Sequence, residues 1–167
     1  MDESEQTEAS DEATRVATFS INVTFRPRTI DPDTISQRLG LTPTWTWRAG
    51  ERVRHPDGWV RPHPERESRW SLIVRYYDRR EDDLDPWNET RDALGPRLND
   101  RLVAFLEPFL NHRSFVCEAV ADSSTASVTL NFPGQFHFGF IIEPTTLGAI
   151  AGLGLEFGFE IFRNSAT

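Results

Sequence analysis

Tryptophan and arginine gather between residues 45 and 70, and this segment holds the side chains best suited to binding. It contains Trp45, Trp47, Trp59 and Trp70 together with six arginines, Arg48, Arg52, Arg54, Arg61, Arg66 and Arg69. Indole rings offer large contact areas and guanidinium groups offer forked hydrogen bonds, so both are frequent at binding hot spots. We therefore expect a recognition surface with the candidate residues Trp45, Trp47, Arg48, Glu51, Arg52, Arg54, Trp59 and Arg61. The alternative is that the tryptophans cover a thin sheet edge and the arginines stack on them.

The charges of this segment restrict its ligands. Four acids, Glu51, Asp57, Glu65 and Glu67, dilute the six arginines. A single-strand nucleic-acid binder would place arginine on phosphates and tryptophan on bases. The mixed charge and the lack of a known RNA or DNA motif argue against this alternative. We expect a protein partner, of which a toxin neutralised by an immunity-type protein is one form. A regulatory domain that binds a small molecule is the alternative.

The chain lacks a recognisable catalytic motif. It contains no phosphate-binding Walker loop, dinucleotide fingerprint, nucleophile elbow or zinc-protease helix, and no lysine that could form a Schiff base. Cys117 is expected to be buried in the middle of a strand, and a nucleophilic role would need His112 or His137 beside it. We expect a protein that is not an enzyme and has no cofactor.

Metal binding is not expected either. His55 and His63, with Asp57, lie at a spacing that matches no zinc pattern, and a single cysteine excludes a cysteine-based site. The acid pair Asp31 and Asp33 is better explained by a helix start, because carboxylates interact favourably with the positive end of the helix dipole.

Length and charge indicate one domain behind an acidic tail. Residues 1–15 hold six of the 26 acids and almost no large apolar side chain, so we expect a disordered tail. Residues 16–165 are expected to form a single globular α+β domain. No apolar run has membrane-spanning length and no signal peptide is evident, which favours a cytoplasmic protein. The sequence leaves its oligomeric state open.

Hydrophobic periodicity predicts the elements that position these residues. Alternation predicts strands over 16–25 and 70–77, and the turn Pro56-Asp57-Gly58 predicts a hairpin with arms near 52–55 and 59–61. Helices are expected over 31–41, after Gly95-Pro96 with a buried stripe from Leu98 to Phe109, and from Thr145. A second start signal stands at Asp85-Pro86, and Pro108 should kink or shorten the last turn of the long helix. Three strands at 114–121, 125–132 and 136–142 are expected to form an antiparallel meander, and 156–162 a last strand with Phe157, Phe159 and Ile161 facing the core.

Two segments, 18–41 and 137–155, each read as a strand, a helix and a terminal Leu-Gly-Leu. We therefore predict an α+β fold with a mostly antiparallel sheet and helices on one face, and a duplicated ferredoxin-like β-α arrangement as its topology.

The same residues are similar to a known family. The runs Asp31-Pro32-Asp33-Thr34-Ile35, Leu39-Gly40-Leu41-Thr42-Pro43 and Arg48-Ala49-Gly50-Glu51, with Trp70 opening a strand, resemble the bacterial family catalogued as domain of unknown function 4279. The long leucine-rich helix and the closing Leu153-Gly154-Leu155 and Glu160-Ile161-Phe162 resemble its second half, so the likeness covers about residues 16–163. It implies a small bacterial domain and brings no established activity or catalytic residue.

Overall fold

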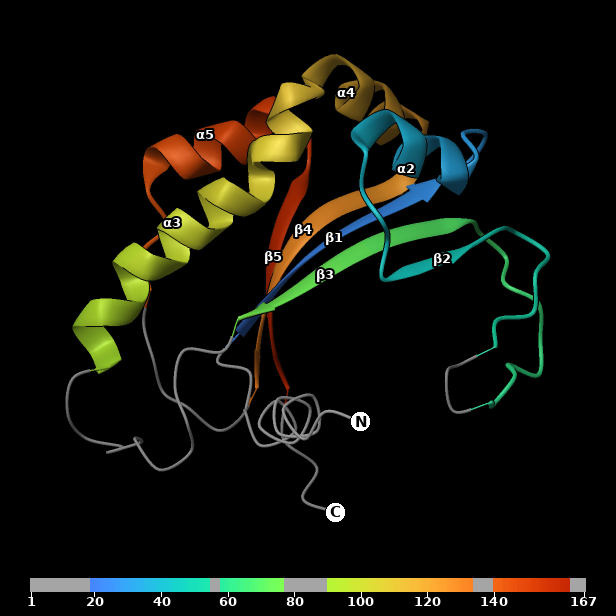
Figure 1. Cartoon of the computed structure of the whole chain (residues 1–167), viewed down its shortest axis with the longest axis horizontal. Helices are drawn as coiled ribbons and strands as arrows, with labels where there is room; N and C mark the ends of the chain where they lie inside the picture. Colours follow the sequence, from blue (N-terminus) through green and yellow to red (C-terminus); the bar gives the residue numbers. More distant parts are fainter. Residues whose placement is uncertain (1–18, 55–57, 77–89, 134–139, 163–167) are drawn as a thin grey trace, which may run out of the picture.

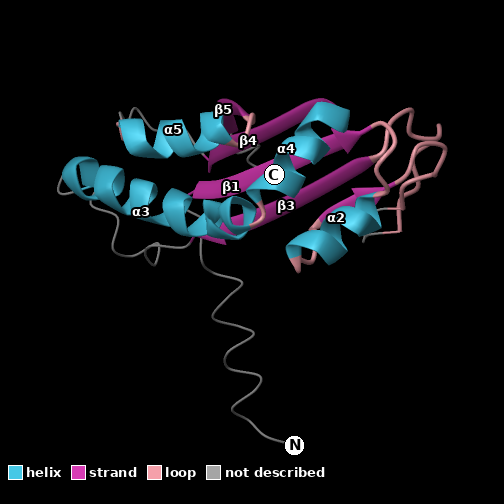
Figure 2. Cartoon of the chain, turned by 90° about the horizontal axis from the view of Figure 1, so that it is seen from above, coloured by secondary structure: helices cyan, strands magenta, loops and turns pink. Residues whose placement is uncertain are grey.

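One sheet with helices on a single face organises the chain. The computed structural model describes residues 19–54, 58–76, 90–133 and 140–162 (Figure 1). In chain order the elements are β1 (Phe19–Pro27), α2 (Pro32–Leu39), β2 (Trp45–Trp47), β3 (Arg69–Tyr76), α3 (Thr90–Asn111), α4 (Arg113–Asp122), β4 (Ser123–Pro133), α5 (Pro144–Gly152) and β5 (Glu156–Phe162). The strand order is β2-β3-β1-β4-β5, antiparallel except for the parallel pair β4 and β5. The described helices cover one face and leave the other open (Figure 2), which confirms the predicted α+β class.

The central strand β1 alternates between the two faces, as its sequence predicted. Phe19, Ile21, Val23 and Phe25 are at most 1 % exposed and face the helices. Phe25 lies opposite Trp70 of β3, which is also fully buried. The predicted strands over 16–25 and 70–77 are confirmed within the described residues, and Val16–Thr18 and Tyr77 lie outside them.

Helix α2 begins and ends as its capping residues predicted. The Asp31 side chain accepts a hydrogen bond from the Asp33 backbone N–H at 2.8 Å, and Pro32 opens the helix. Gly40 follows the last turn at a φ of 67°, a left-handed conformation that glycine adopts without strain. The helix is attached to the sheet by the Trp70 Nε1–H, which donates to Ser36 Oγ at 2.9 Å.

Helix α3 carries the predicted apolar stripe, and its bounds differ from the prediction. Its core residues Leu98, Leu102, Phe105, Leu106 and Phe109 are all buried. The helix begins at Thr90, before Gly95-Pro96, and it ends at Asn111, soon after Pro108. The predicted start signal at Asp85-Pro86 lies outside the described residues.

The predicted three-stranded meander is wrong. Its first strand, 114–121, is helix α4, in which the buried residues Phe115, Val116 and Ala119 have helical spacing. Its second strand is confirmed as part of β4, which pairs with β1 instead. In the expected third strand, residues 136–139 lie outside the described chain and Phe140–Ile142 have no strand structure.

Because the segment 114–121 is helical, the environment of Cys117 also differs from the prediction. The residue is exposed on α4, with its Sγ 3.8 Å from the Gly152 carbonyl oxygen, and the prediction of a buried position in a strand is wrong. On an amphipathic helix, a residue between Val116 and Glu118 falls outside the buried stripe, whereas on a strand it would alternate with its neighbours.

Strand β5 is confirmed, but two of its expected core residues are exposed. Phe157, Phe159 and Ile161 lie beside Val128, Leu130 and Phe132 of β4. Phe157 is half-buried, whereas Phe159 is 62 % and Ile161 56 % exposed. Both lie on an edge strand, which pairs with β4 alone among the described residues.

The two β-α units are therefore not equivalent. Gly154 follows the Leu153 cap of α5 with a φ of 74°, and Gly40 caps α2 with a φ of 67°, so both units have a glycine in the left-handed conformation soon after the helix. The described part of the second unit has no strand before its helix, and five strands in the order β2-β3-β1-β4-β5 do not form two ferredoxin-like halves.

Asp122, the last residue of α4, connects this helix to the turn after β1 through hydrogen bonds. Its carboxylate accepts hydrogen bonds from the backbone N–H groups of Arg28, Thr29 and Ile30 at 2.9–3.2 Å, and from the Thr29 hydroxyl at 2.6 Å. Partial burial opposes ionisation, but hydrogen bonds from Ile30, Thr29 and Arg28 outweigh it and lower the pKa of Asp122 to about 2.

We predict that Asp122→Asn lowers the free energy of unfolding at pH 7 by about 1–2 kcal/mol, because a neutral amide is the weaker acceptor. In the unfolded chain this carboxyl titrates near its usual pKa of about 3.9, above its value in the folded protein. The stabilisation is therefore complete well above pH 4 and is lost as the pH falls from about 4 to about 2. Urea unfolding at several pH values should show the wild type and the variant converging in acid.

The control is Asp100→Asn on the exposed side of α3, which should change stability by less than about 0.5 kcal/mol. A difference between Asp122→Asn and wild type that widens in acid would contradict the predicted linkage.

Candidate functional site

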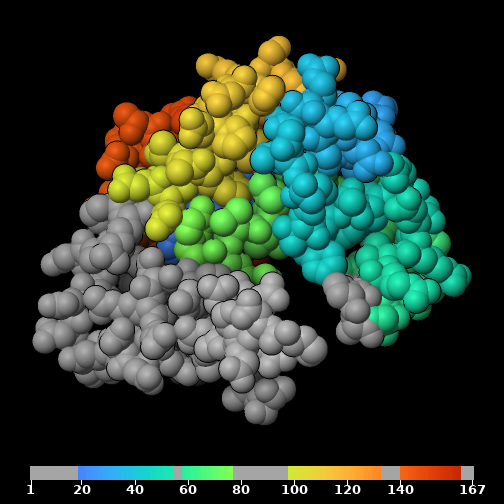
Figure 3. Space-filling model, viewed as in Figure 1, coloured from blue at the N-terminus to red at the C-terminus, as the bar shows by residue number. Residues whose placement is uncertain are grey.

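The segment between β2 and β3 leaves the sheet and returns to it at one end of the molecule (Figures 1 and 3). Its described arms contact each other: Arg54 and Val60 form an antiparallel bridge, and the Arg61 N–H donates to the Val53 carbonyl at 3.0 Å. These contacts agree with the predicted hairpin, whose turn at 55–57 lies outside the described residues.

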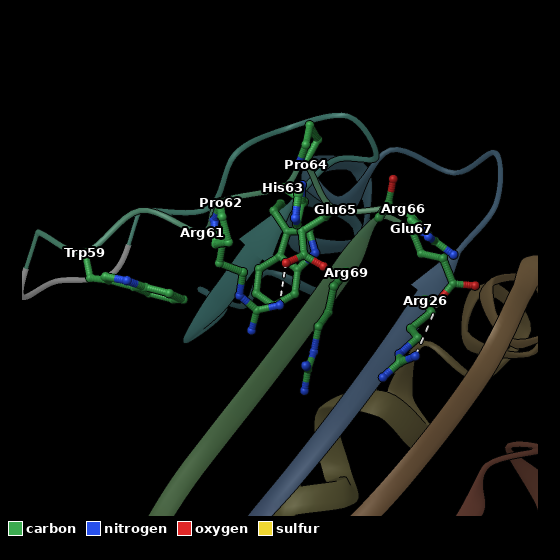
Figure 4. Close-up of a pocket in the computed structure, with 12 residues that line it drawn as sticks. Arg26, Trp59, Arg61, Pro62, His63, Pro64, Glu65, Arg66, Glu67 and Arg69 are labelled. Atoms are coloured by element: carbon green, nitrogen blue, oxygen red, sulfur yellow. Dashed lines mark hydrogen bonds and ion pairs between the residues drawn. The ribbon is translucent and has the colours of Figure 1, made fainter.

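A pocket of about 690 Å³ lies where this segment meets the sheet. We name it the arginine pocket, and its lining residues come from β1, β2, β3 and the returning segment: Arg26, Trp47, Trp59, Arg61, Pro62, His63, Pro64, Glu65, Arg66, Glu67, Ser68 and Arg69 (Figure 4). Four arginines face two glutamates in this lining, so the pocket is positive on a chain whose net charge is −8.

Strand register places the centre of the pocket on the open face of the sheet. Trp47 lies opposite Arg69 in the β2–β3 pair, and the following residue, Trp70, points into the core. Because side chains alternate along a strand, Arg69 and Trp47 face away from the helices. The Arg69 guanidinium carbon is 5.3 Å from the Trp47 ring centroid, and that of Arg61 is 5.8 Å from the same ring. Both are cation–π distances.

Two of the four pocket arginines, Arg26 and Arg61, have carboxylate partners, and Arg69 is not one of them. Arg61 pairs with Glu65 at 2.5 Å and Arg26 pairs with Glu67 at 3.3 Å. Arg69 donates instead to hydroxyl groups, with Nε 2.9 Å from Ser71 Oγ and a terminal nitrogen 3.5 Å from Thr24 Oγ1. Within the described chain no carboxylate forms an ion pair with Arg69.

The surroundings of Arg69 disfavour its charge. Burial is the largest cause that lowers the pKa of Arg69, and the like charges of Arg26 and Arg61 lower it further, against an opposing effect of Glu65. An arginine remains charged at neutral pH even so. Arg69 and Arg26 extend side by side from neighbouring strands, with Arg61 and Glu65 above them (Figure 4). The pocket thus holds a positive charge that the described protein does not neutralise.

Of the residues predicted from sequence, Trp47, Trp59 and Arg61 line this pocket. Trp45 lies half-buried on β2, and Arg52 and Arg54 are exposed; none of the three is in the lining.

Arg48 and Glu51 belong to a different cluster. Arg48 donates to Asp31 at 2.9 and 3.1 Å and to Asp33, and its backbone N–H donates to Glu51 at 2.8 Å. The hydrogen bond from Arg48 is the largest cause that lowers the pKa of Asp31. These contacts join the segment after β2 to the start of α2, and none of these residues lines the arginine pocket.

Sequence reasoning missed Arg26 and did not place Arg69 in the site. Each lies next to an aromatic core residue, Phe25 or Trp70, on a strand that alternates. That alternation was the available signal, because the neighbour of a core residue must point to the opposite face. It could not reveal that the two strands are adjacent at this point.

The histidines considered as metal ligands do not gather in the described chain. Within the residues the structure places, no three histidine, cysteine, aspartate or glutamate side chains gather closely enough to hold a metal ion. His63 lines the arginine pocket, while His55 lies outside the described residues. Among the helices placed here, none combines the length and apolar character needed to span a bilayer.

The chain belongs to the family described as Domain of unknown function (DUF4279), whose model matches residues 12–162. The resemblance noted in the sequence is thereby confirmed over nearly the whole chain. Comparisons with curated proteins and with solved structures find no match.

We predict that Arg69→Gln leaves the free energy of unfolding within about 1 kcal/mol of wild type, or raises it. The substitution removes a half-buried charge that has no carboxylate partner in the described chain, and glutamine can still donate to the hydroxyls of Ser71 and Thr24. Urea unfolding at neutral pH is the measurement.

Glu65→Gln is the matched control. It removes the partner of Arg61 from the same cluster of arginines, so it should destabilise by about 1 kcal/mol. A loss above about 2 kcal/mol for Arg69→Gln would mean that Arg69 is mainly a structural residue.

Proposed function

We propose that this protein is a non-enzymatic binding module that recognises a protein partner through the arginine pocket, with an acidic side chain of the partner seated on Arg69. The observation that carries the proposal is the half-buried Arg69 guanidinium, which has hydroxyl and aromatic neighbours but no carboxylate partner in the described chain. A bound carboxylate would supply that counter-charge.

The Arg69 side chain is preorganised for such a ligand by its neighbours. Its Nε donates a hydrogen bond to Ser71, a fully buried residue whose hydroxyl lies 2.7 Å from Thr24 Oγ1, and its guanidinium carbon lies 5.3 Å from the Trp47 ring centroid. A guanidinium fork that is already oriented loses little conformational entropy on binding, and the pair it forms with a carboxylate is directional.

The pocket rim favours a macromolecule over a free ion. Trp59 is 55 % exposed at the edge of the pocket, and its neighbour Val60 is 36 % exposed. An exposed indole beside the positively charged arginine pocket is typical of protein interfaces. Aromatic and arginine side chains contribute most of the binding energy there. Toxin neutralisation by an immunity-type protein is one form that such binding could take.

A small anionic molecule is the second candidate, because a volume of about 690 Å³ is within the range of small-molecule sites.

The test is a titration of the full chain with acidic peptides and their neutral counterparts, in which glutamine replaces glutamate. We expect tryptophan fluorescence to report binding of the acidic peptides only, because Trp47 and Trp59 line the pocket. Arg69→Gln should weaken that binding about tenfold or more, since it removes a charge-assisted pair. The control is Arg75→Gln, an exposed arginine farther along the same strand, which should bind like wild type.

Separate arms identify the other ligand classes. Binding of a dicarboxylate without binding of any peptide would transfer the site to the small-molecule candidate. Binding of a single-stranded oligonucleotide that weakens steeply with salt would indicate nucleic acid. Equal peptide affinity for wild type and Arg69→Gln would overturn the proposal.

A further inference from the structure

Strand β5 is an edge strand with an apolar surface. It lies at the end of the sheet order, and no described residue pairs with its outer side. Three of its seven residues are large, apolar and exposed: Phe159 at 62 %, Ile161 at 56 % and Phe162 at 53 %. A strand edge that carries exposed aromatic residues is a ready template for pairing with another strand.

The opposite edge of the sheet is protected. Strand β2 has only three residues, and beyond it the Thr44 side chain takes the place of a strand neighbour. Thr44 Oγ1 both accepts from the Ile73 N–H at 2.9 Å and donates to the Ile73 carbonyl at 3.3 Å. The protection of one edge and not the other makes β5 the side at which the sheet can extend.

We propose that β5 pairs antiparallel with β5 of a second copy of this chain, around a two-fold axis at Phe159. This register aligns all seven residues of both strands. It sets Phe159 against Phe159 of the second copy, Phe157 against Ile161, and Glu160 against Gly158.

Repulsion between glutamates disfavours the two adjacent registers, which are centred on Gly158 and Glu160. Centring the pair on Gly158 would set Glu156 directly against Glu160 at two positions, and centring it on Glu160 would set that residue against itself. Like charges directly opposite each other destabilise a strand pair. The register centred on Phe159 avoids both and joins the apolar side chains on the helix-covered face.

The resulting dimer would contain one continuous sheet with both helix layers on the same side. Further apolar groups near this edge could add to the contact: Leu147 of α5 is 40 % exposed, and Ile141, just before α5, is 80 % exposed. The arginine pockets would lie at the two distant ends of the sheet, because β2 and β5 are opposite edges. The pairing is therefore independent of the proposed function and would make the protein bivalent for its partner.

Cross-linking tests the register directly. All variants carry Cys117→Ser, which removes the single native cysteine. With a short bismaleimide, Phe159→Cys should form a covalent dimer. Phe162→Cys alone should not, because two copies of this position lie roughly 20 Å apart in this register. A mixture of Phe162→Cys and Glu156→Cys should again cross-link, since these positions lie opposite each other.

Sedimentation equilibrium tests the association itself. We expect the mass of the wild-type chain to rise from monomer toward dimer with concentration. Phe159→Glu should raise the dissociation constant about tenfold or more, because it sets two carboxylates against each other. The control is Val103→Glu, which places the same charge at a residue of α3 that is 49 % exposed and should leave the association unchanged.

Circular dichroism of both variants should match wild type, since Phe159 and Val103 are exposed. A monomeric mass at every concentration would overturn the inference, and so would equal cross-linking of Phe162→Cys and Phe159→Cys.

Discussion

All described helices lie on one face of the sheet, and this constraint determines what every strand residue can do. On β1 and β3 one set of alternating side chains packs against the hydrophobic core around Phe25 and Trp70. The side chains at the intervening positions of β1 and β3 therefore point to the open face of the sheet. Arg26, Trp47 and Arg69 converge there because three neighbouring strands each contribute an outward-facing position at the same end of the sheet. The pocket is a consequence of burial on the opposite side.

Much of the fold could be predicted because local sequence and tertiary packing agree. In β1 and β3 a period of two marks half-buried strands, and in α2 the Asp31 cap, Pro32 and Gly40 specify both ends of the helix. The prediction of a strand over 114–121 was wrong because Phe115, Cys117 and Ala119 recur at every second position within a short apolar run, a spacing that also fits a strand. The chain uses the competing helical set, Phe115, Val116 and Ala119, since α4 packs those residues against β1 and β4. Short apolar runs often fit both periods, and tertiary contacts decide between them.

The candidate site was predictable in composition but not in geometry. Clustered tryptophan and arginine identified the segment that contributes Trp47, Trp59 and Arg61. The same composition also suggested Arg48 and Glu51, which are occupied by ion pairs and hydrogen bonds around the start of α2. What distinguishes Arg48 from Arg69 is the identity of their neighbours. Arg48 lies beside Asp31 and Asp33, whereas Arg69 lies beside Ser71, Thr24 and Trp47, and only the strand register reveals this.

The contrast between Arg48 and Arg69 is the strongest argument for the proposed binding of an acidic partner at the arginine pocket. An arginine that serves stability acquires carboxylate partners, as Arg48 does near the exposed surface. Arg69 is half-buried, is repelled by Arg26 and Arg61, and has only neutral groups within hydrogen-bonding distance in the described chain. Packing alone could be provided at this position by an uncharged side chain, without the desolvation of a cation. A cation held in this way contributes most when an external anion completes its surroundings, because the cost of orienting and partly dehydrating the guanidinium has already been met in folding.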